Sequence, residues 1–144
     1  MRILIDADGC PVVDIAIRIA KGNDMQCIIM CDSAHFFERD GAQTITVSKG
    51  ADAVDFALVN LVHPGDVVIT QDYGLAALCL SRRAVVINQD GMIYDNDNIG
   101  GLLEQRAMSA KIRRSGGRLS GPSKRTEAQN QAFASALSKL IAEN

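Results

Sequence analysis

The feature of this chain that most limits its fold is a series of short apolar runs separated by segments with helical patterns. Each run is continuously apolar, which is typical of strands that are covered on both faces of a sheet. Strands and helices in this alternating order predict a parallel sheet with right-handed crossovers. We therefore expect an α/β fold, a three-layer α/β/α sandwich with a mainly parallel central sheet. The expected strands are 3–5, 26–30, 44–47, 67–69 and 84–87, and the expected helices lie near 11–21, 51–62 and 73–81.

The last part of the chain is expected to add helices to one domain of 144 residues. Residues 88–94 have the pattern of a turn followed by a short strand or hairpin. Thr126 and Gln129 have the spacing of a capping box, and the apolar stripe that follows predicts packing against the core, with a homodimer contact as the alternative. The expected parts are an α/β core over 1–97, a helix over 98–113, a flexible basic loop over 114–125 and a C-terminal amphipathic helix over 126–142.

Composition narrows the class of protein. No apolar stretch approaches the roughly 18 residues that cross a bilayer, so no membrane association is expected. The first segment reaches Asp6 after only three apolar residues, which does not fit a secretory signal. The four cysteines form neither a CxxC pair nor a zinc spacing with the two histidines, as is typical of reduced thiols. These features predict a cytoplasmic protein.

The acidic residues fall where the expected strands end. Of the 17 acids, 13 are Asp, and every Asp precedes residue 98. In an open parallel sheet the junctions from strand to helix share one edge, and ligands bind there. We therefore expect carboxylates from distant parts of the sequence to converge at this edge. The acids at these junctions are Asp6, Asp8, Asp32, Asp52, Asp55 and Asp72.

Converging carboxylates repel one another and attract cations. Two carboxylates about 4 Å apart repel by about 4 kcal/mol at an effective dielectric near 20. Their oxygens suit Mg²⁺ or Mn²⁺, which orient a phosphodiester and activate water. As the structural alternative, Asp52 and Asp72 also suit helix N-termini. The predicted site has Asp6, Asp52 and Asp72 as metal ligands, Asp8 as a further catalytic acid, and Asp55, Thr70 and Gln71 in supporting positions.

The carboxyl-terminal part of the chain is basic, in contrast to the acidic first part. Residues 1–103 hold 14 acids and seven Lys or Arg, whereas residues 104–144 hold three acids and eight Lys or Arg. A flexible cationic segment binds a phosphate backbone without reading bases, and the scarcity of aromatic residues argues against base stacking. RNA is the expected partner, with a solvated loop as the alternative. The expected contacts are Lys111, Arg113, Arg114, Arg118, Lys124 and Arg125, together with Ser33 and His35 after the second strand.

Three motifs resemble those of the bacterial YaiI/YqxD family, and the similarity covers nearly the whole chain. That family looks related to the PIN-like nucleases. The resemblance implies a PIN-like fold in which acids at the ends of the first and fourth strands and on an intervening helix bind Mg²⁺ or Mn²⁺ to hydrolyse RNA. By position, Asp6 and Asp72 match the strand-end acids, and Asp52 or Asp55 matches the helical one. The motifs are 6–12 (DADGCPV), 50–55 (GADAVD) and 68–77 (VITQDYGLAA).

The sequence leaves three hypotheses for the function. The leading hypothesis is a divalent-metal-dependent ribonuclease-like domain. An alternative from another class is a non-catalytic RNA-binding or adaptor module that keeps a vestigial acidic site. The third is a haloacid-dehalogenase-like phosphatase, in which Asp6 is the nucleophile, Asp8 is the general acid and Thr70 ends a later strand.

Overall fold

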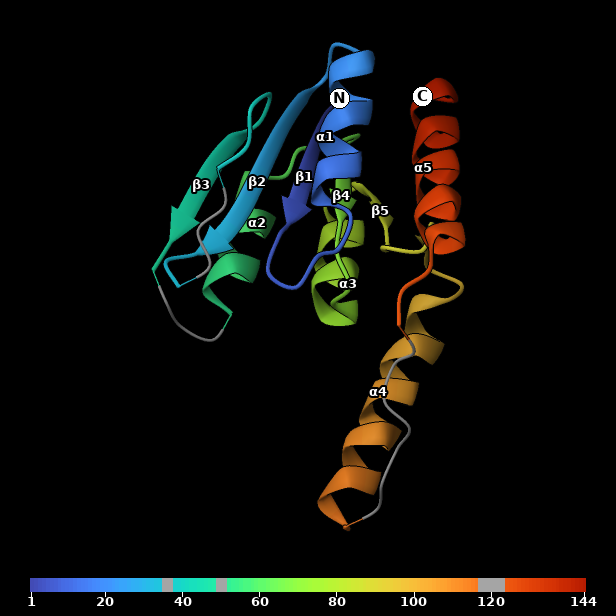
Figure 1. Cartoon of the computed structure of the whole chain (residues 1–144). Helices are drawn as coiled ribbons and strands as arrows, with labels where there is room; N and C mark the ends of the chain where they lie inside the picture. The colour runs from blue at the N-terminus through green and yellow to red at the C-terminus, as the bar shows by residue number, and fades with distance from the viewer. Residues whose placement is uncertain (35–37, 49–51, 117–123) are drawn as a thin grey trace.

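A central sheet organises the structure, a computed structural model that describes residues 1–34, 38–48, 52–116 and 124–144. Its strands are β1 (Arg2–Asp6), β2 (Gln26–Asp32), β3 (Gln43–Val47), β4 (Val67–Ile69), β5 (Val85–Ile87) and β6 (Ile93–Tyr94). Within the described ranges the six strands lie in the order β3-β2-β1-β4-β5-β6 (Figure 1). Strands β1 to β5 run parallel, and β6 is antiparallel to β5. The predicted mainly parallel sheet is confirmed.

Helices cover both faces of this sheet. The helices are α1 (Val13–Gly22), α2 (Ala53–Leu61), α3 (Tyr73–Ser81), α4 (Ile99–Arg114) and α5 (Glu127–Ala142). Helices α1 and α5 lie on one face of the sheet, and α2 and α3 lie on the other (Figure 1). The predicted three-layer α/β/α sandwich is therefore confirmed.

The central strand β1 shows why these residues form a fully covered sheet. Ile3 and Ile5 point into the core under α1 and α5, whereas Leu4 points into the core under α2 and α3. All three side chains are 0% exposed, which explains why the run is continuously apolar. Burial of each of these side chains contributes about 1.5–3 kcal/mol to the stability of the fold. In the register of the sheet, Leu4 lies beside Ile28 of β2 and Val68 of β4.

Helix α5 begins and packs as its sequence predicts. The backbone N–H of Thr126 donates to Gln129 Oε1 at 2.8 Å, and the N–H of Gln129 donates to Thr126 Oγ1 at 3.3 Å. This reciprocal capping box satisfies two N–H groups that have no partner within the helix. Phe133, Leu137 and Leu140 are buried in the core beside α1. The interpretation of the apolar stripe as core is confirmed.

Helix α4 extends away from the sheet (Figure 1). Its first turn contacts the core through Ile99 and Leu102, but no residue of the helix is fully buried. Its 16 residues give it a length of about 24 Å. Among the described residues, no helix is both long enough and apolar enough to cross a membrane.

A partly buried ion pair joins β1 and the start of β4 at their amino ends, opposite the edge predicted to carry the site. The guanidinium Nη2 of Arg2 donates to Asp66 Oδ2 at 2.6 Å, and the N–H of His63 donates to the same oxygen at 2.8 Å. Burial raises the pKa of Asp66, but these hydrogen bonds outweigh it and hold the pKa below its ordinary value. The pair stabilises this end of the sheet.

Candidate functional site

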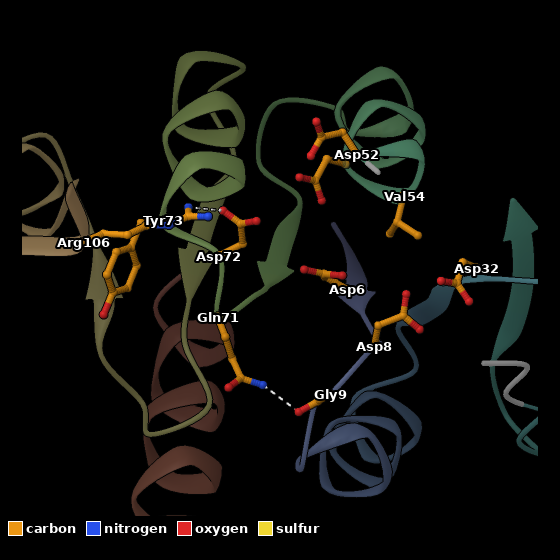
Figure 2. A pocket seen from close by; sticks show the side chains of 11 residues that line it. Asp6, Asp8, Gly9, Asp32, Asp52, Val54, Gln71, Asp72, Tyr73 and Arg106 are labelled. Atoms are coloured by element: carbon orange, nitrogen blue, oxygen red, sulfur yellow. Dashed lines mark hydrogen bonds and ion pairs between the residues drawn. The ribbon is translucent and has the colours of Figure 1, made fainter. Parts of the chain in front are cut away.

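The carboxyl edge of the sheet forms an open cavity of about 580 Å³, which we call the acidic cavity. Strands β1 and β4 are neighbours although they are not consecutive, so their following loops diverge and leave a crevice where ligands bind in such sheets. Figure 2 shows Asp6 between Asp72 on one side and Asp8 and Asp32 on the other. The predicted convergence of these carboxylates is therefore confirmed. The cavity is lined by Asp6, Asp8, Gly9, Asp32, Asp52, Val54, Asp55, Gln71, Asp72, Tyr73 and Arg106.

Asp6 is the carboxylate whose electrostatics are most perturbed. It ends β1, and the hydroxyl of Thr70 donates to its Oδ2 at 2.8 Å. Burial raises the pKa of Asp6 from 3.8 to about 6; the negative charges of Asp55, Asp72 and Asp8 add to this, while the Thr70 hydrogen bond opposes it. The ionised form of Asp6 is therefore less stable than that of an ordinary Asp in the absence of a cation.

Thr70 holds two acids of the cavity in place. Its side chain, in a residue only 1% exposed, donates to Asp6 and accepts from the backbone N–H of Asp72 at 3.0 Å. The Tyr94 hydroxyl in turn donates to the Thr70 carbonyl at 3.3 Å. These bonds link the end of β1 to the start of α3. The structure thus places Thr70 in a supporting position, as predicted, where it fixes the turn after β4.

Asp72 caps a helix and also lines the acidic cavity. Its Oδ1 accepts from the N–H groups of Gly74 at 2.8 Å and Leu75 at 3.2 Å, so it caps α3 as its alternative interpretation predicts. The same oxygen forms an ion pair with Arg106 Nη1 at 3.2 Å. All three contacts use Oδ1, and they fix the orientation of the carboxylate at the cavity.

Asp52 and Asp55 lie at the start of α2. Asp52 occupies the N-cap position of α2 with a left-handed φ of +65°, as its placement at a helix N-terminus predicts, but its side chain makes no capping hydrogen bond. A left-handed non-glycine residue is strained, and such residues cluster at functional sites. Burial raises the pKa of Asp55, and the charges of Asp72 and Asp52 raise it further against the opposing effect of Arg106.

The two loops on either side of the crevice are joined by Gln71. Its Nε2 donates to the carbonyl oxygen of Gly9 at 2.8 Å, across 62 positions of sequence. Gly9 has a φ of +72°, a conformation that glycine adopts without strain. Gln71 therefore holds the two loops together, which agrees with its predicted supporting position.

The remaining predicted positions are less closely tied to the cavity. Asp32 lines it and accepts a hydrogen bond from the N–H of Ala34 at 2.9 Å. Ser33 is exposed and is not among the lining residues. His35 lies outside the described residues, as does Arg118 of the basic segment.

Arg106 is a cavity residue that the sequence analysis missed. It comes from α4, and its guanidinium, in a side chain 60% exposed, reaches Asp72. Its position, 34 residues after Asp72, follows no motif that links it to the strand ends. No signal in the sequence identifies it, because its placement depends on how α4 leaves the body of the protein.

The basic residues predicted to contact RNA divide into two groups. Lys111, Arg113 and Arg114 are exposed in the last turn of α4, and Lys124 is exposed before α5. Arg125, in contrast, donates to Asp90 Oδ1 at 2.8 Å, to Asn130 Oδ1 at 2.6 Å and to the Gln89 carbonyl. These bonds anchor the start of α5 to the turn before β6, a structural role that the sequence analysis did not foresee.

The acidic cavity offers oxygen ligands without a preformed metal cage. Among the described residues, no group of three or more His, Cys, Asp or Glu side chains is placed to hold a metal ion. Mg²⁺ keeps several waters and uses only one or two protein carboxylates, so it does not need such a cage. The donor set and the raised pKa of Asp6 therefore fit a hydrated divalent cation.

Comparison with known proteins identifies relatives over the full length. A family model described as an uncharacterised bacterial YaiI/YqxD family matches residues 4–143. A UPF0178 protein of Exiguobacterium sibiricum is 52% identical, with 99% of this chain and 98% of the relative covered. UPF0178 proteins of Clostridium tetani and Clostridium acetobutylicum are 47% and 43% identical, with 98% of this chain and 97% of each relative covered. No solved structure matches significantly.

Proposed function

The chain belongs to the YaiI/YqxD family, and from its acidic cavity we propose that it is a Mg²⁺- or Mn²⁺-dependent phosphodiester hydrolase that acts on RNA. The observation that carries this proposal is the gathering of six Asp side chains around one open cavity at the carboxyl edge of the sheet. A cavity of this kind repels anions unless a cation is bound. Its polar, open character suits a charged, extended substrate better than a small apolar one.

Three carboxylates are proposed to hold the metal, one or two of them directly and the others through the waters that the cation keeps. Asp6 and Asp72 flank the crevice at the ends of β1 and β4, and Asp52 faces it from the start of α2 without a capping bond (Figure 2). When bound, the cation supplies a water of lowered pKa as nucleophile and offsets charge on the phosphate oxygens. Asp8 and Asp55 add negative charge at the rim, which strengthens cation binding.

The residues around Asp6 control the charge that it carries. Thr70 holds Oδ2 of Asp6 in place and favours the ionised form, whereas burial and the neighbouring acids favour the protonated form. Because the resulting pKa is about 6, Asp6 is protonated in acid and ionised at neutral pH. We therefore propose that metal binding and hydrolysis strengthen as the pH rises through about 6.

The exposed bases of α4 supply the proposed contact with RNA phosphates. Lys111, Arg113 and Arg114 lie at the end of the helix farthest from the acidic cavity (Figure 1). Such contacts release counterions, so they confer binding that weakens with salt and is indifferent to sequence. The distance between this basic end and the cavity favours a polymer over a mononucleotide as substrate.

One observation bears on the alternative hydrolase. In a haloacid-dehalogenase-like phosphatase, Thr70 has to reach the phosphate of the substrate. Here its hydroxyl donates to Asp6, and its oxygen accepts from the Asp72 N–H. Thr70 is therefore engaged in holding the acids, which favours hydrolysis by activated water over attack by Asp6.

The test measures metal binding and hydrolysis separately. Mn²⁺ is titrated calorimetrically into the wild type, Asp6→Asn and Asp97→Asn, the last an exposed acid that does not line the cavity. We expect Asp6→Asn to lose Mn²⁺ binding and cleavage of single-stranded RNA, and Asp97→Asn to retain both. Cleavage that is unchanged in Asp6→Asn would refute the assignment. Binding of RNA by the wild type without turnover under Mg²⁺ or Mn²⁺ would instead establish the adaptor hypothesis.

A further inference from the structure

A second hollow, which we call the side groove, opens beside the acidic cavity between α2 and α3. Its volume is about 270 Å³, and it shares Asp52, Asp55, Asp72 and Arg106 with the acidic cavity. The groove is therefore continuous with the site proposed for the phosphodiester. A ligand that occupies both places its charged part in the cavity and another part in the groove.

The side groove differs from the cavity by its apolar walls. Phe56 of α2 is 64% exposed and Leu78 of α3 is 47% exposed, and both line the groove. These are among the large apolar side chains that the described part of the chain leaves in solvent. Scattered exposed apolar residues need no explanation, but two that face one hollow beside a polar site indicate a binding surface.

Gly74 keeps the groove open at the start of α3. A Cβ at this position would lie 3.3 Å from Asp72 Oδ1 and 3.8 Å from Arg106 Nη1. The absence of a side chain at Gly74 therefore leaves room where the ion pair between Arg106 and Asp72 borders the groove. A larger residue here would narrow the passage between the groove and the acidic cavity.

The chemistry of the groove selects the uncharged part of a nucleotide. Three of its lining residues are acids, which repel a phosphate but accept hydrogen bonds from the amino groups of bases. Its volume lies just below the approximately 300–1,000 Å³ of sites for drug-sized ligands, so it fits one planar ring system and not a folded partner. An exposed aromatic face such as that of Phe56 stacks on any base.

Arg106 is the cation that joins the two hollows. It lines both, and its side chain is mostly exposed, so its guanidinium can exchange the Asp72 carboxylate for a phosphate oxygen of a ligand. Arginine binds phosphate through two parallel hydrogen bonds. Release of Asp72 by Arg106 at the same time leaves that carboxylate available in the acidic cavity.

We propose that the side groove binds one base of single-stranded RNA by stacking on Phe56 against Leu78, with the adjoining phosphate held by Arg106. The inference rests on the proposed function, because it places the base next to the phosphodiester that is to be hydrolysed. It requires a single strand, since the bases of a duplex are stacked on one another and cannot enter the groove. The scarcity of aromatic residues argued against base stacking, but the single exposed ring of Phe56 is enough to stack on one base beside the acidic cavity.

The experiment compares a fluorescently labelled RNA nonamer with an abasic oligomer of the same length and charge. Binding is measured by anisotropy at low salt in EDTA, with Asp6→Asn as the common background so that cleavage does not interfere. We expect the nonamer to bind about tenfold more tightly than the abasic oligomer, within the range known for stacking of a base on an aromatic side chain. Phe56→Leu, which keeps the apolar surface without the ring, is expected to abolish most of this preference, and Phe56→Trp to retain it.

The outcomes separate this inference from the proposed function. Equal affinity for the two oligomers, or a preference that survives in Phe56→Leu, overturns the side groove as a base site. If the wild type then cleaves RNA with Mn²⁺, the hydrolase proposal stands without the groove. If base-dependent binding is lost in Phe56→Leu but the wild type cleaves no RNA with Mg²⁺ or Mn²⁺, the groove stands and the hydrolase proposal fails.

Discussion

Replacement of Asp6 by Asn is expected to make the metal-free protein more stable at neutral pH. Burial and neighbouring acids raise the pKa of Asp6 from 3.8 to about 6, so its ionisation opposes folding. Each pH unit between the two values corresponds to about 1.4 kcal/mol, which gives a cost of at most about 3 kcal/mol above pH 6. Asn has the same shape, carries no charge, and still accepts the Thr70 hydrogen bond. The variant is therefore relieved of this cost.

The pH dependence follows from the sign of the shift. Between pH 3.8 and about 6 the folded state holds a proton on Asp6 that the unfolded state has released. The free energy of unfolding of the wild type therefore falls as the pH rises through this window. Asp6→Asn lacks this contribution, so its advantage is greatest above pH 6 and shrinks as the pH approaches 4. Asp97→Asn, at an exposed site outside the cavity, is expected to follow the wild type.

Urea unfolding in EDTA at several pH values measures these differences, and a second series with Mn²⁺ tests their link to the site. Mn²⁺ at about 100 times its Kd adds about 2.7 kcal/mol to a protein that binds it. Because only the wild type gains this, saturating Mn²⁺ is expected to remove the advantage of Asp6→Asn. An Asp6→Asn protein that is less stable than the wild type at pH 7.5 in EDTA would refute the reasoning.

Two further substitutions test the bonds around the sheet. Thr70→Val removes the hydroxyl that donates to Asp6 and is expected to raise the pKa of Asp6 further, as read by carbon-detected NMR titration. Thr70→Ser should restore the wild-type pKa, and an unchanged pKa in Thr70→Val would contradict the role of the bond. Asp66→Ala leaves the partly buried guanidinium of Arg2 without its carboxylate and is expected to lower the free energy of unfolding by about 3 kcal/mol in urea, with Mn²⁺ affinity unchanged. A loss below about 1 kcal/mol would contradict this expectation.

The acids of the site could be predicted because their positions follow from local signals. The apolar run before Asp6 marks a buried strand, and the run before Asp72 marks another. Once both strands belong to one parallel sheet, their carboxyl ends share an edge whatever the details of packing. The same logic applies to Asp52, which lies at the N-terminus of a helix, as its position in the sequence indicates.

Other parts of the site depend on contacts between elements that no local pattern specifies. Arg106 reaches Asp72 only because α4 leaves the core in a particular direction, and Arg125 is an anchor only because α5 returns to the turn at Asp90. The exposed ring of Phe56 can be recognised as part of a binding surface only because residues of α3 line the same groove. These relations arise from the relative placement of helices, which is set by packing and loop geometry.

The sequence alone therefore determined the sheet, its two covering layers and the edge at which the carboxylates meet. The apolar runs and the acids that follow them are local features of the sequence. In a parallel sheet the strands formed by these runs end at one edge, so the acids are brought together there. Only the tertiary structure decided that the side chain of Arg106 lines the acidic cavity, which hydroxyl holds Asp6 and which apolar side chains border the groove beside it. Those partners come from distant segments, and side chains meet across such distances only when the whole chain has packed.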